Sequence, residues 1–110
     1  LKTEDDKCIL VGSSMGGYVA LMASAEVEAH AVFLMAPALY MRGYKEDCCT
    51  AHEHLQIVHG WSDDVIPPEH SIRYAREADC TLHLIRGDHP LNGSIEMIEA
   101  LFEQFLTRVL

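Results

Sequence analysis

The stretch Cys8-Ile9-Leu10-Val11-Gly12-Ser13-Ser14-Met15-Gly16-Gly17 decides how this chain is interpreted. Its apolar first half predicts a buried strand over Cys8–Gly12, and the Ala-, Leu- and Met-rich segment Met15–Glu26 predicts a helix. The pattern Gly-x-Ser-x-Gly lies between them, where a strained strand-to-helix turn would lift the Ser14 hydroxyl clear of a sheet. We expect the glycines Gly16 and Gly17 to permit close backbone approach. Ser14 is therefore a candidate nucleophile, which needs a histidine and a carboxylate to activate it.

The composition limits the class of protein. A chain of 110 residues predicts a single domain over residues 1–110, and 49% hydrophobic with 23% charged residues is typical of a soluble globular protein. Lys and Arg number 8 against 17 Asp and Glu, which gives a formal net charge of -9. Such a charge repels phosphate backbones and anionic lipid surfaces. We therefore predict neither a nucleic-acid partner nor a membrane partner.

The cysteines indicate a reducing compartment. Cys8, Cys48, Cys49 and Cys80 form no Cys-x-x-Cys pair, so we predict free thiols and a cytoplasmic location. Another possibility is a metal cluster in the short segment that holds Cys48, Cys49, His52 and His54. Adjacent cysteines and a His-x-His step do not match the common zinc spacings, so no metal site is predicted.

Strand and helix patterns alternate along the chain, which predicts an α/β fold with a mostly parallel sheet flanked by helices. The other expected strands are His30–Ala36, Leu55–His59 and Cys80–Ile85, with a connector over Ala38–Glu53. One helix begins at Pro67 and Pro68 and runs to about Ala78, because proline suits a first helical turn. The last runs from about Ser94 to Val109 and has an apolar stripe that should cover one face of the sheet: Ile95, Ile98, Phe102, Phe105, Leu106 and Val109.

Three polar side chains follow three of the expected strands. Ser14 follows the first, Asp63 lies in the segment His59–Pro67 after the third, and His89 lies in Gly87–Pro90 after the fourth. The carboxyl ends of parallel strands meet at one edge of a sheet, where ligand sites form. We therefore expect these three side chains to converge.

These motifs resemble those of the α/β-hydrolases. The nucleophile elbow of that family matches Gly12 to Gly16, its Gly-x-x-Asp-x-x-x-Pro acid turn matches Gly60 to Pro67, and its Gly-Asp-His loop matches Gly87 to His89. The resemblance covers essentially the whole chain and is strongest to small, capless carboxylesterases and thioesterases. It implies a fold that lacks the family's N-terminal strands, so we expect this chain to be the C-terminal portion of a longer one.

The resemblance also implies roles for individual residues. Ser14, Asp63 and His89 would form a catalytic triad that hydrolyses small esters or thioesters through an acyl-enzyme, without a cofactor. Asp63 stands three residues after the glycine, as the family's acid does, so it ranks above Asp64 and above Asp88. The backbone N–H of Met15 would donate to the oxyanion, and the family's second donor comes from an earlier segment that this sequence does not contain.

Each of these residues also has a plainer interpretation. Ser14 could cap the following helix, Asp63 could form a turn, and His89 could be a surface loop residue. We interpret four other histidines as structural or surface groups: His30, His59, His70 and His83.

The substrate pocket is the least determined part of the site. Five residues in or beside the converging loops could line an apolar acyl pocket, and ordinary packing is an equally good explanation for each: Met15, Leu39, Tyr40, Trp61 and Leu91. The connector from Pro37 to Glu53 is too short for a helical cap of any size, which predicts an open site.

The first expected strand, Cys8–Gly12, could pair with a further strand at its free edge. Without earlier strands it would expose an apolar edge, and such an edge tends to recruit another strand. The neighbour would be an N-terminal segment missing from this sequence, a second chain, or a second copy in a homodimer. The alternative function is therefore a non-catalytic or incomplete module that associates through this edge.

Overall fold

The computed structural model describes residues 7–44 and 54–110. In this part of the chain, four strands form one sheet in the order β1-β2-β3-β4, and each neighbouring pair is parallel. The strands are β1 (Ile9–Ser13), β2 (Ala31–Met35), β3 (Leu55–Gly60) and β4 (Thr81–Ile85). The predicted parallel sheet is therefore confirmed, with strand ends that differ by at most one residue from those expected.

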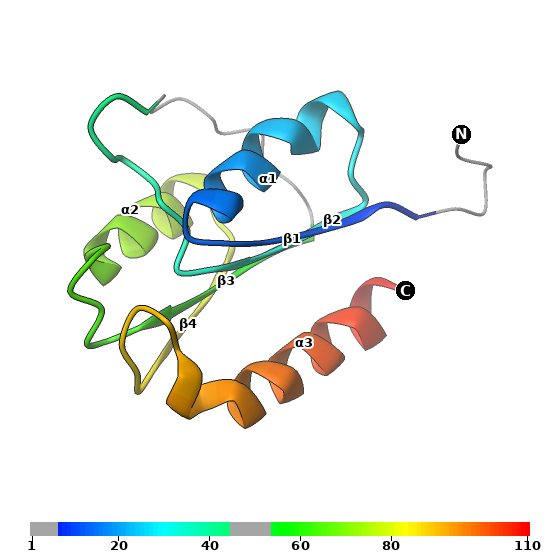
Figure 1. Cartoon of the computed structure of the whole chain (residues 1–110). Helices are drawn as coiled ribbons and strands as arrows, with labels where there is room; N and C mark the ends of the chain where they lie inside the picture. Colours follow the sequence, from blue (N-terminus) through cyan, green and yellow to red (C-terminus); the bar gives the residue numbers. More distant parts are fainter. Residues whose placement is uncertain (1–6, 45–53) are drawn as a thin grey trace.

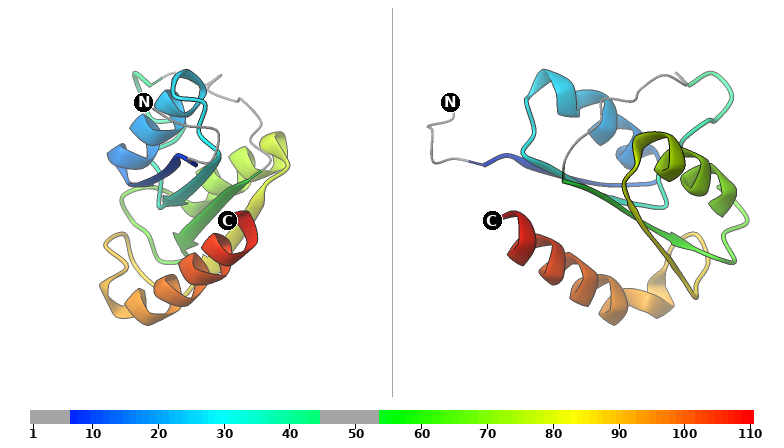
Figure 2. Two further views of the ribbon diagram at one scale, coloured as in Figure 1. Left: turned by 90° about the vertical axis from the view of Figure 1, so that its right-hand side faces the viewer. Right: turned by 180° about the vertical axis from the view of Figure 1, so that it is seen from behind.

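Helices cover both faces of the sheet. Helix α1 (Met15–Glu26) and helix α2 (Pro68–Ala78) lie on one face, and α3 (Ile95–Val109) lies on the other, which makes three layers (Figures 1 and 2). A short 3₁₀ turn, η1 (Asn92–Ser94), leads into α3. Pro68 is the first residue of α2, where its missing N–H leaves no helical bond unmade.

Helix α3 packs through its apolar stripe. Phe105 and Val109 are buried against the sheet residues Phe33 and Val58, with Ile98 and Phe102 beside them. Ile95 departs from the expected stripe, because 52% of it is exposed at the start of the helix. At the other end, the imidazole of His30 lies 2.6 Å from the carbonyl oxygen of Val109 and ties the helix to the sheet.

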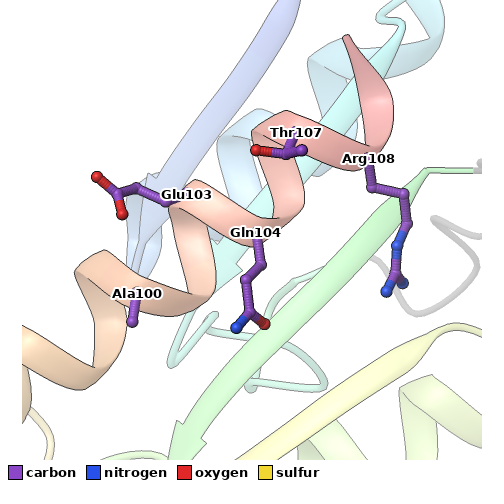
Figure 3. Close-up of a pocket in the computed structure, with 5 residues that line it drawn as sticks. All are labelled: Ala100, Glu103, Gln104, Thr107 and Arg108. Atoms are coloured by element: carbon purple, nitrogen blue, oxygen red, sulfur yellow. The ribbon is translucent and has the colours of Figure 1, made fainter.

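The opposite side of α3 is polar and carries a hollow (Figure 3). Its lining comes from one helix alone: Ala100, Glu103, Gln104, Thr107 and Arg108. All five residues are exposed. The hollow contains none of the three predicted triad residues, and a surface made by a single helix encloses little of a ligand.

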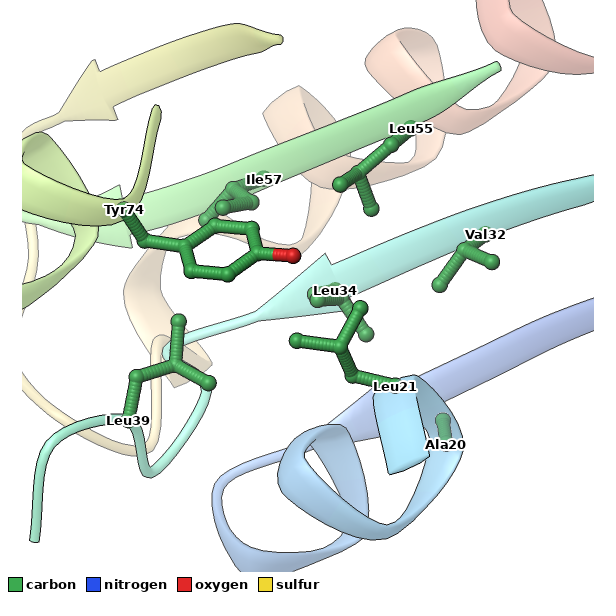
Figure 4. Close-up of a cluster of buried hydrophobic side chains, with 8 residues drawn as sticks. All are labelled: Ala20, Leu21, Val32, Leu34, Leu39, Leu55, Ile57 and Tyr74. Atoms are coloured by element: carbon green, nitrogen blue, oxygen red, sulfur yellow. The ribbon is translucent and has the colours of Figure 1, made fainter. Parts of the chain in front are cut away.

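The larger core cluster fills the space between the sheet and the helices α1 and α2 (Figure 4). Side chains from β2 and β3 meet α1 and α2 there, and the members are Ala20, Leu21, Val32, Leu34, Leu39, Leu55, Ile57 and Tyr74. Alternate residues of β2 contribute to opposite faces, since Val32 and Leu34 enter this cluster and Phe33 enters the other. Both faces of the central strands are thus buried, which explains the continuous apolar sequence of β2.

The turn between β1 and α1 depends on two glycines. A side-chain carbon on Gly12 would lie 2.3 Å from the carbonyl oxygen of Gly16, and one on Gly17 would lie 2.9 Å from the Pro37 side chain. Gly16 differs, because a carbon there would meet no atom within 4 Å among the described residues. The expectation of close approach is therefore right for Gly17 and wrong for Gly16, which faces solvent.

This difference predicts opposite outcomes for two adjacent substitutions. Gly17→Ala should lower the free energy of unfolding by about 1–3 kcal/mol, because the new methyl group overlaps Pro37. Gly16→Ala should leave it unchanged or raise it by up to about 1 kcal/mol, because alanine favours a helix. Urea unfolding of both variants tests this pair, and equal effects would contradict the packing seen at Gly17.

Strand β1 lies at an edge of the described sheet, since within residues 7–44 and 54–110 it pairs with β2 alone. Its residue Val11 is 47% exposed, although it lies in the middle of an apolar strand. The described residues contain no helix that is both long enough and apolar enough to cross a membrane.

Candidate active site

The three polar loops meet at one edge of the sheet, beyond the carboxyl ends of the strands (Figure 1, left). Close packing of two glycines brings two of these loops together. A side-chain carbon on Gly60 would lie 2.4 Å from the carbonyl oxygen of Gly87, so only glycine allows the loops after β3 and β4 to touch. The amide of Ser62 then donates to that same oxygen at 3.0 Å.

Ser14 occupies a strained backbone position between β1 and α1. Its φ is 54° and its ψ is -122°, a conformation that side-chain-bearing residues rarely adopt. Neighbouring backbone holds it there, since its N–H donates to Met35 at 3.0 Å and its carbonyl accepts from Ala38 at 2.9 Å. Among the described residues, its hydroxyl makes no capping hydrogen bond to α1, which argues against the helix-cap interpretation.

His89 connects Ser14 to Asp63. Its Nε2 lies 3.0 Å from the Ser14 hydroxyl oxygen, and its Nδ1 lies 2.8 Å from Oδ2 of Asp63. An ionised carboxylate only accepts hydrogen bonds, so Nδ1 carries a proton and its N–H donates a hydrogen bond to Asp63. In the neutral imidazole, Nε2 is then free to accept from the serine hydroxyl. The arrangement is that of a general base poised on a nucleophile.

The Asp63 carboxylate is buried and fully engaged. Its side chain has no exposed surface, and its Oδ1 accepts from the amides of Val65 at 2.9 Å and Ile66 at 2.8 Å. Burial would raise the pKa of Asp63, but the hydrogen bonds from His89, Ile66 and Val65 outweigh it and lower that pKa. Asp63 therefore forms the turn and also faces the histidine, so the two interpretations of this residue are compatible.

The two other candidate acids lie apart from the histidine contact. Asp64 is exposed, and Asp88 is exposed with its Oδ1 accepting from the amide of Leu91 at 3.2 Å. Neither carboxylate occupies the position next to His89 that Asp63 takes. Asp63, the aspartate that the spacing after Gly60 indicates, is thus the one of the three that contacts His89.

Met15, whose amide is the expected oxyanion donor, directly follows Ser14. Met15 is the first residue of α1, and amides of a first helical turn have no acceptor inside the helix. The Met15 N–H thus remains directed out of the helix end, where the helix dipole favours negative charge. The Met15 side chain is 62% exposed.

The other proposed pocket residues differ in their surroundings. Leu39 and Leu91 are buried, and Leu39 belongs to the core cluster with Tyr74. The Tyr40 hydroxyl donates to Glu77 of α2 at 2.9 Å, so this side chain is tied to a helix. Trp61 is 58% exposed. Packing thus accounts for Leu39, Tyr40 and Leu91, while Met15 and Trp61 offer exposed apolar surface in these loops.

Three of the other histidines make ordinary structural contacts. His30 binds the end of α3, the Nδ1 of His70 lies 2.7 Å from the carbonyl oxygen of Leu39, and His83 lies 3.0 Å from Gln56. His59 is also buried, but its ring lies 3.1 Å from the Asp63 carboxylate. We did not expect this contact from the sequence, although the four-residue spacing across Gly60 could have suggested it.

The alternative metal cluster falls mostly outside the described residues, which omit Cys48, Cys49 and His52. Within the described ranges, no three His, Cys, Asp or Glu residues are grouped so that they could hold a metal ion. Burial raises the pKa of the Cys80 thiol to about 11, so this thiol stays protonated and unreactive at neutral pH.

Comparison with solved structures supports the resemblance to the α/β-hydrolases. No protein-family model and no curated protein matches the sequence. Among solved structures, a member of the alpha/beta hydrolase superfamily from Xanthomonas campestris pv. campestris is 30% identical, with a TM-score of 0.86 over 96% of this chain and 60% of its own. An α/β serine hydrolase without a lid from Xanthomonas campestris is 20% identical, with a TM-score of 0.84 over 96% of this chain and 49% of its own.

A mouse protein, alpha/beta hydrolase domain-containing protein 10, is 19% identical, with a TM-score of 0.74 over 100% of this chain and 66% of its own. The chain thus spans less than two thirds of the length of each of these proteins. It has the α/β-hydrolase fold, and it resembles members of that superfamily over nearly all of its residues.

Proposed function

We propose that this chain is a serine hydrolase that cleaves carboxylic esters or thioesters of small substrates. The observation that carries the proposal is the continuous hydrogen-bonded series from Ser14 through His89 to Asp63. The strained backbone at Ser14 adds to it, because such strain persists where the surrounding structure is built to hold it. The lidless serine hydrolase from Xanthomonas campestris offers a precedent for this activity on the same fold.

In the proposed mechanism, His89 takes the proton of the Ser14 hydroxyl as the serine oxygen attacks the carbonyl carbon. Asp63 holds the imidazole in the tautomer that leaves Nε2 free, and it stabilises the imidazolium that forms. The Met15 amide donates to the developing oxyanion. His89 then returns the proton to the leaving alcohol or thiol, and a water molecule activated by the same imidazole releases the acid from Ser14.

The expected substrates are small and uncharged or cationic. The net charge of -9 disfavours approach of anionic substrates at low salt. His89 retains 18% side-chain exposure, which is consistent with a site open to solvent. The connector expected to lack a cap includes residues 45–53, which lie outside the described part of the chain. The proposed site needs no cofactor, and we propose the cytoplasm as its location.

A second candidate function is association through the edge strand. The observation that favours it is the half-exposed apolar residue Val11 on a strand whose outer side has no pairing within the described ranges. Such an edge would accept a further strand from another segment or another copy. In this alternative, the chain would be a non-catalytic module that associates with a partner through β1.

Labelling with a fluorophosphonate probe tests the proposed function. A working triad should lead to one phosphonyl group per chain, attached to Ser14 and located by mass spectrometry of the digested protein. The adjacent Ser13 is an internal control, because it is exposed but lies outside the hydrogen-bonded series. In the His89→Ala variant we expect labelling to fall at least about 100-fold, the lower end of what general-base catalysis contributes.

Two outcomes would count against the proposed function. Equal labelling of Ser13 and Ser14 would show that the hydroxyl of Ser14 is not activated. Absence of labelling in a sample whose circular dichroism shows the folded state would favour the association hypothesis instead. If labelling succeeds, p-nitrophenyl esters and acyl thioesters of increasing chain length would then define the acyl group.

A further inference from the structure

His59 forms a second imidazole contact to the same carboxylate that faces His89. It lies near the end of β3, and neither its side chain nor that of Asp63 has exposed surface. Its Nε2 is 3.1 Å from Oδ2 of Asp63 and 2.8 Å from the carbonyl oxygen of Ile66. On the other side of the ring, Nδ1 is 2.7 Å from the hydroxyl oxygen of Ser71, a buried residue of α2.

These partners determine which ring nitrogen of His59 carries the proton. A carbonyl oxygen and a carboxylate can only accept hydrogen bonds, so the Nε2 that faces both must donate. A bare Nε2 would place its lone pair against two oxygen atoms. The Ser71 hydroxyl can rotate, and it satisfies the neutral ring by donating to Nδ1. Nε2 of His59 therefore carries a proton.

The consequence for Asp63 is that both of its oxygens are held from two sides. The amides of Val65 and Ile66 donate to Oδ1 and His89 donates to Oδ2, while Nε2 of His59 lies 3.1 Å from Oδ2. The His59 bond to the Ile66 carbonyl also fixes the backbone of the turn that supplies one of those amides. Rotation of the carboxylate away from His89 would thus break contacts at both oxygens.

We propose that His59, oriented by Ser71, is a positioning residue that holds the Asp63 carboxylate in line with His89. This inference rests on the proposed hydrolase function. It extends the series of polar contacts to five side chains, in the order Ser14, His89, Asp63, His59 and Ser71. His59 and Ser71 lie outside the reacting atoms and act only through the carboxylate.

Two amide variants of His59 separate positioning from general stability. Glutamine carries its terminal nitrogen as many bonds from Cα as Nε2 of histidine, so His59→Gln keeps an N–H directed at Asp63 and Ile66. Asparagine carries its nitrogen at the distance of Nδ1, so His59→Asn directs an N–H at Ser71 and leaves Oδ2 without this donor. Both variants replace the imidazole ring with a neutral amide and differ mainly in how far the amide nitrogen reaches. They therefore form a matched pair.

We expect the rate constant for fluorophosphonate labelling of Ser14 to fall by about 10- to 100-fold in His59→Asn, because small displacements of a positioned group reduce rates by up to that amount. In His59→Gln most of the rate should return. With a p-nitrophenyl ester, the loss in His59→Asn should appear in kcat, with KM nearly unchanged, because the substrate does not touch His59. Thermal unfolding of both variants shows whether they are folded at the assay temperature.

Nuclear magnetic resonance provides a second measurement that does not depend on these variants. Long-range ¹H–¹⁵N correlation spectra of the wild-type chain should show a proton on Nε2 of His59. In Ser71→Ala, the loss of the hydroxyl partner should leave the His59 ring less firmly oriented and reduce labelling by several-fold. His83→Gln is the control, because His83 bonds to Gln56 of the neighbouring strand and should leave labelling unchanged.

The possible results distinguish this inference from the proposed function. If the wild-type chain labels at Ser14 but His59→Asn and His59→Gln label at the same rate, the hydrolase proposal stands and the positioning role is overturned. A wild-type His59 protonated only at Nδ1 would also overturn it. If the folded wild-type chain does not label at all, the hydrolase proposal fails and the positioning role fails with it.

Discussion

Replacing Asp63 with asparagine should lower kcat for ester hydrolysis by about 10⁴-fold, while the chain stays folded. The substitution keeps the shape of the side chain, and the amide oxygen can still accept from Val65 and Ile66. The amide nitrogen would face His89, however, and it donates hydrogen bonds instead of accepting them. His89 would then take the tautomer with its proton on Nε2, which cannot accept the proton of Ser14.

The adjacent residue provides the control for this variant. Asp64→Asn makes the same chemical change one position later, at an exposed side chain that lies apart from His89, and should leave kcat within about twofold because exposed substitutions have small effects. Asp63→Asn should also lose stability, by about 1–3 kcal/mol, since its amide nitrogen would replace the buried oxygen that accepts from His89 and lies 3.1 Å from Nε2 of His59. Steady-state kinetics and urea unfolding measure the two effects separately. Equal kcat values for Asp63→Asn and Asp64→Asn would remove Asp63 from the triad.

The parallel sheet could be predicted from sequence because its strands are short apolar runs separated by helical patterns. Both faces of β2 and β3 are covered by helices, so residues on both faces of these strands are buried. Each strand therefore appears in the sequence as a short, mainly apolar segment. The bounds of α1 were also predictable, since Gly-rich sequence marks its start and the Ala-rich segment continues to Glu26. The spacing of Asp63 after Gly60 and the order of the three loops predicted which side chains would meet.

Other features depend on contacts between segments that are distant in sequence. Gly16 and Gly17 look equivalent in the sequence, and only the position of Pro37 distinguishes them. The role of His59 depends on Ser71 of α2 and on the turn at Ile66, neither of which a motif around His59 contains. Tyr40 lies in a loop of the expected pocket, but its hydroxyl binds Glu77 of α2. Side-chain direction in loops is set by such tertiary partners.

Two substitutions of Ser14 should have the same effect on activity but different effects on stability. Ser14→Ala and Ser14→Gly both remove the hydroxyl, so each should reduce kcat by about 10⁶-fold, as expected for loss of a triad nucleophile. Alanine retains a side-chain carbon and thus the strain at φ 54° and ψ -122°. Glycine adopts this conformation without that strain, which amounts to about 1–3 kcal/mol at such a position.

Part of this gain is offset, because glycine also gives the unfolded chain more freedom, at a cost of about 0.4–1 kcal/mol. Ser14→Gly should therefore exceed Ser14→Ala in free energy of unfolding by about 1 kcal/mol, measured by urea denaturation of the two variants side by side. Gly12 and Gly17 pack around the turn, so the backbone has little room to relax in the alanine variant. If Ser14→Ala proved more stable than Ser14→Gly by about 0.4–1 kcal/mol, the turn would store no strain. A stable glycine variant with no activity would instead show that the conformation is kept for the chemistry of the serine and opposes stability of the fold.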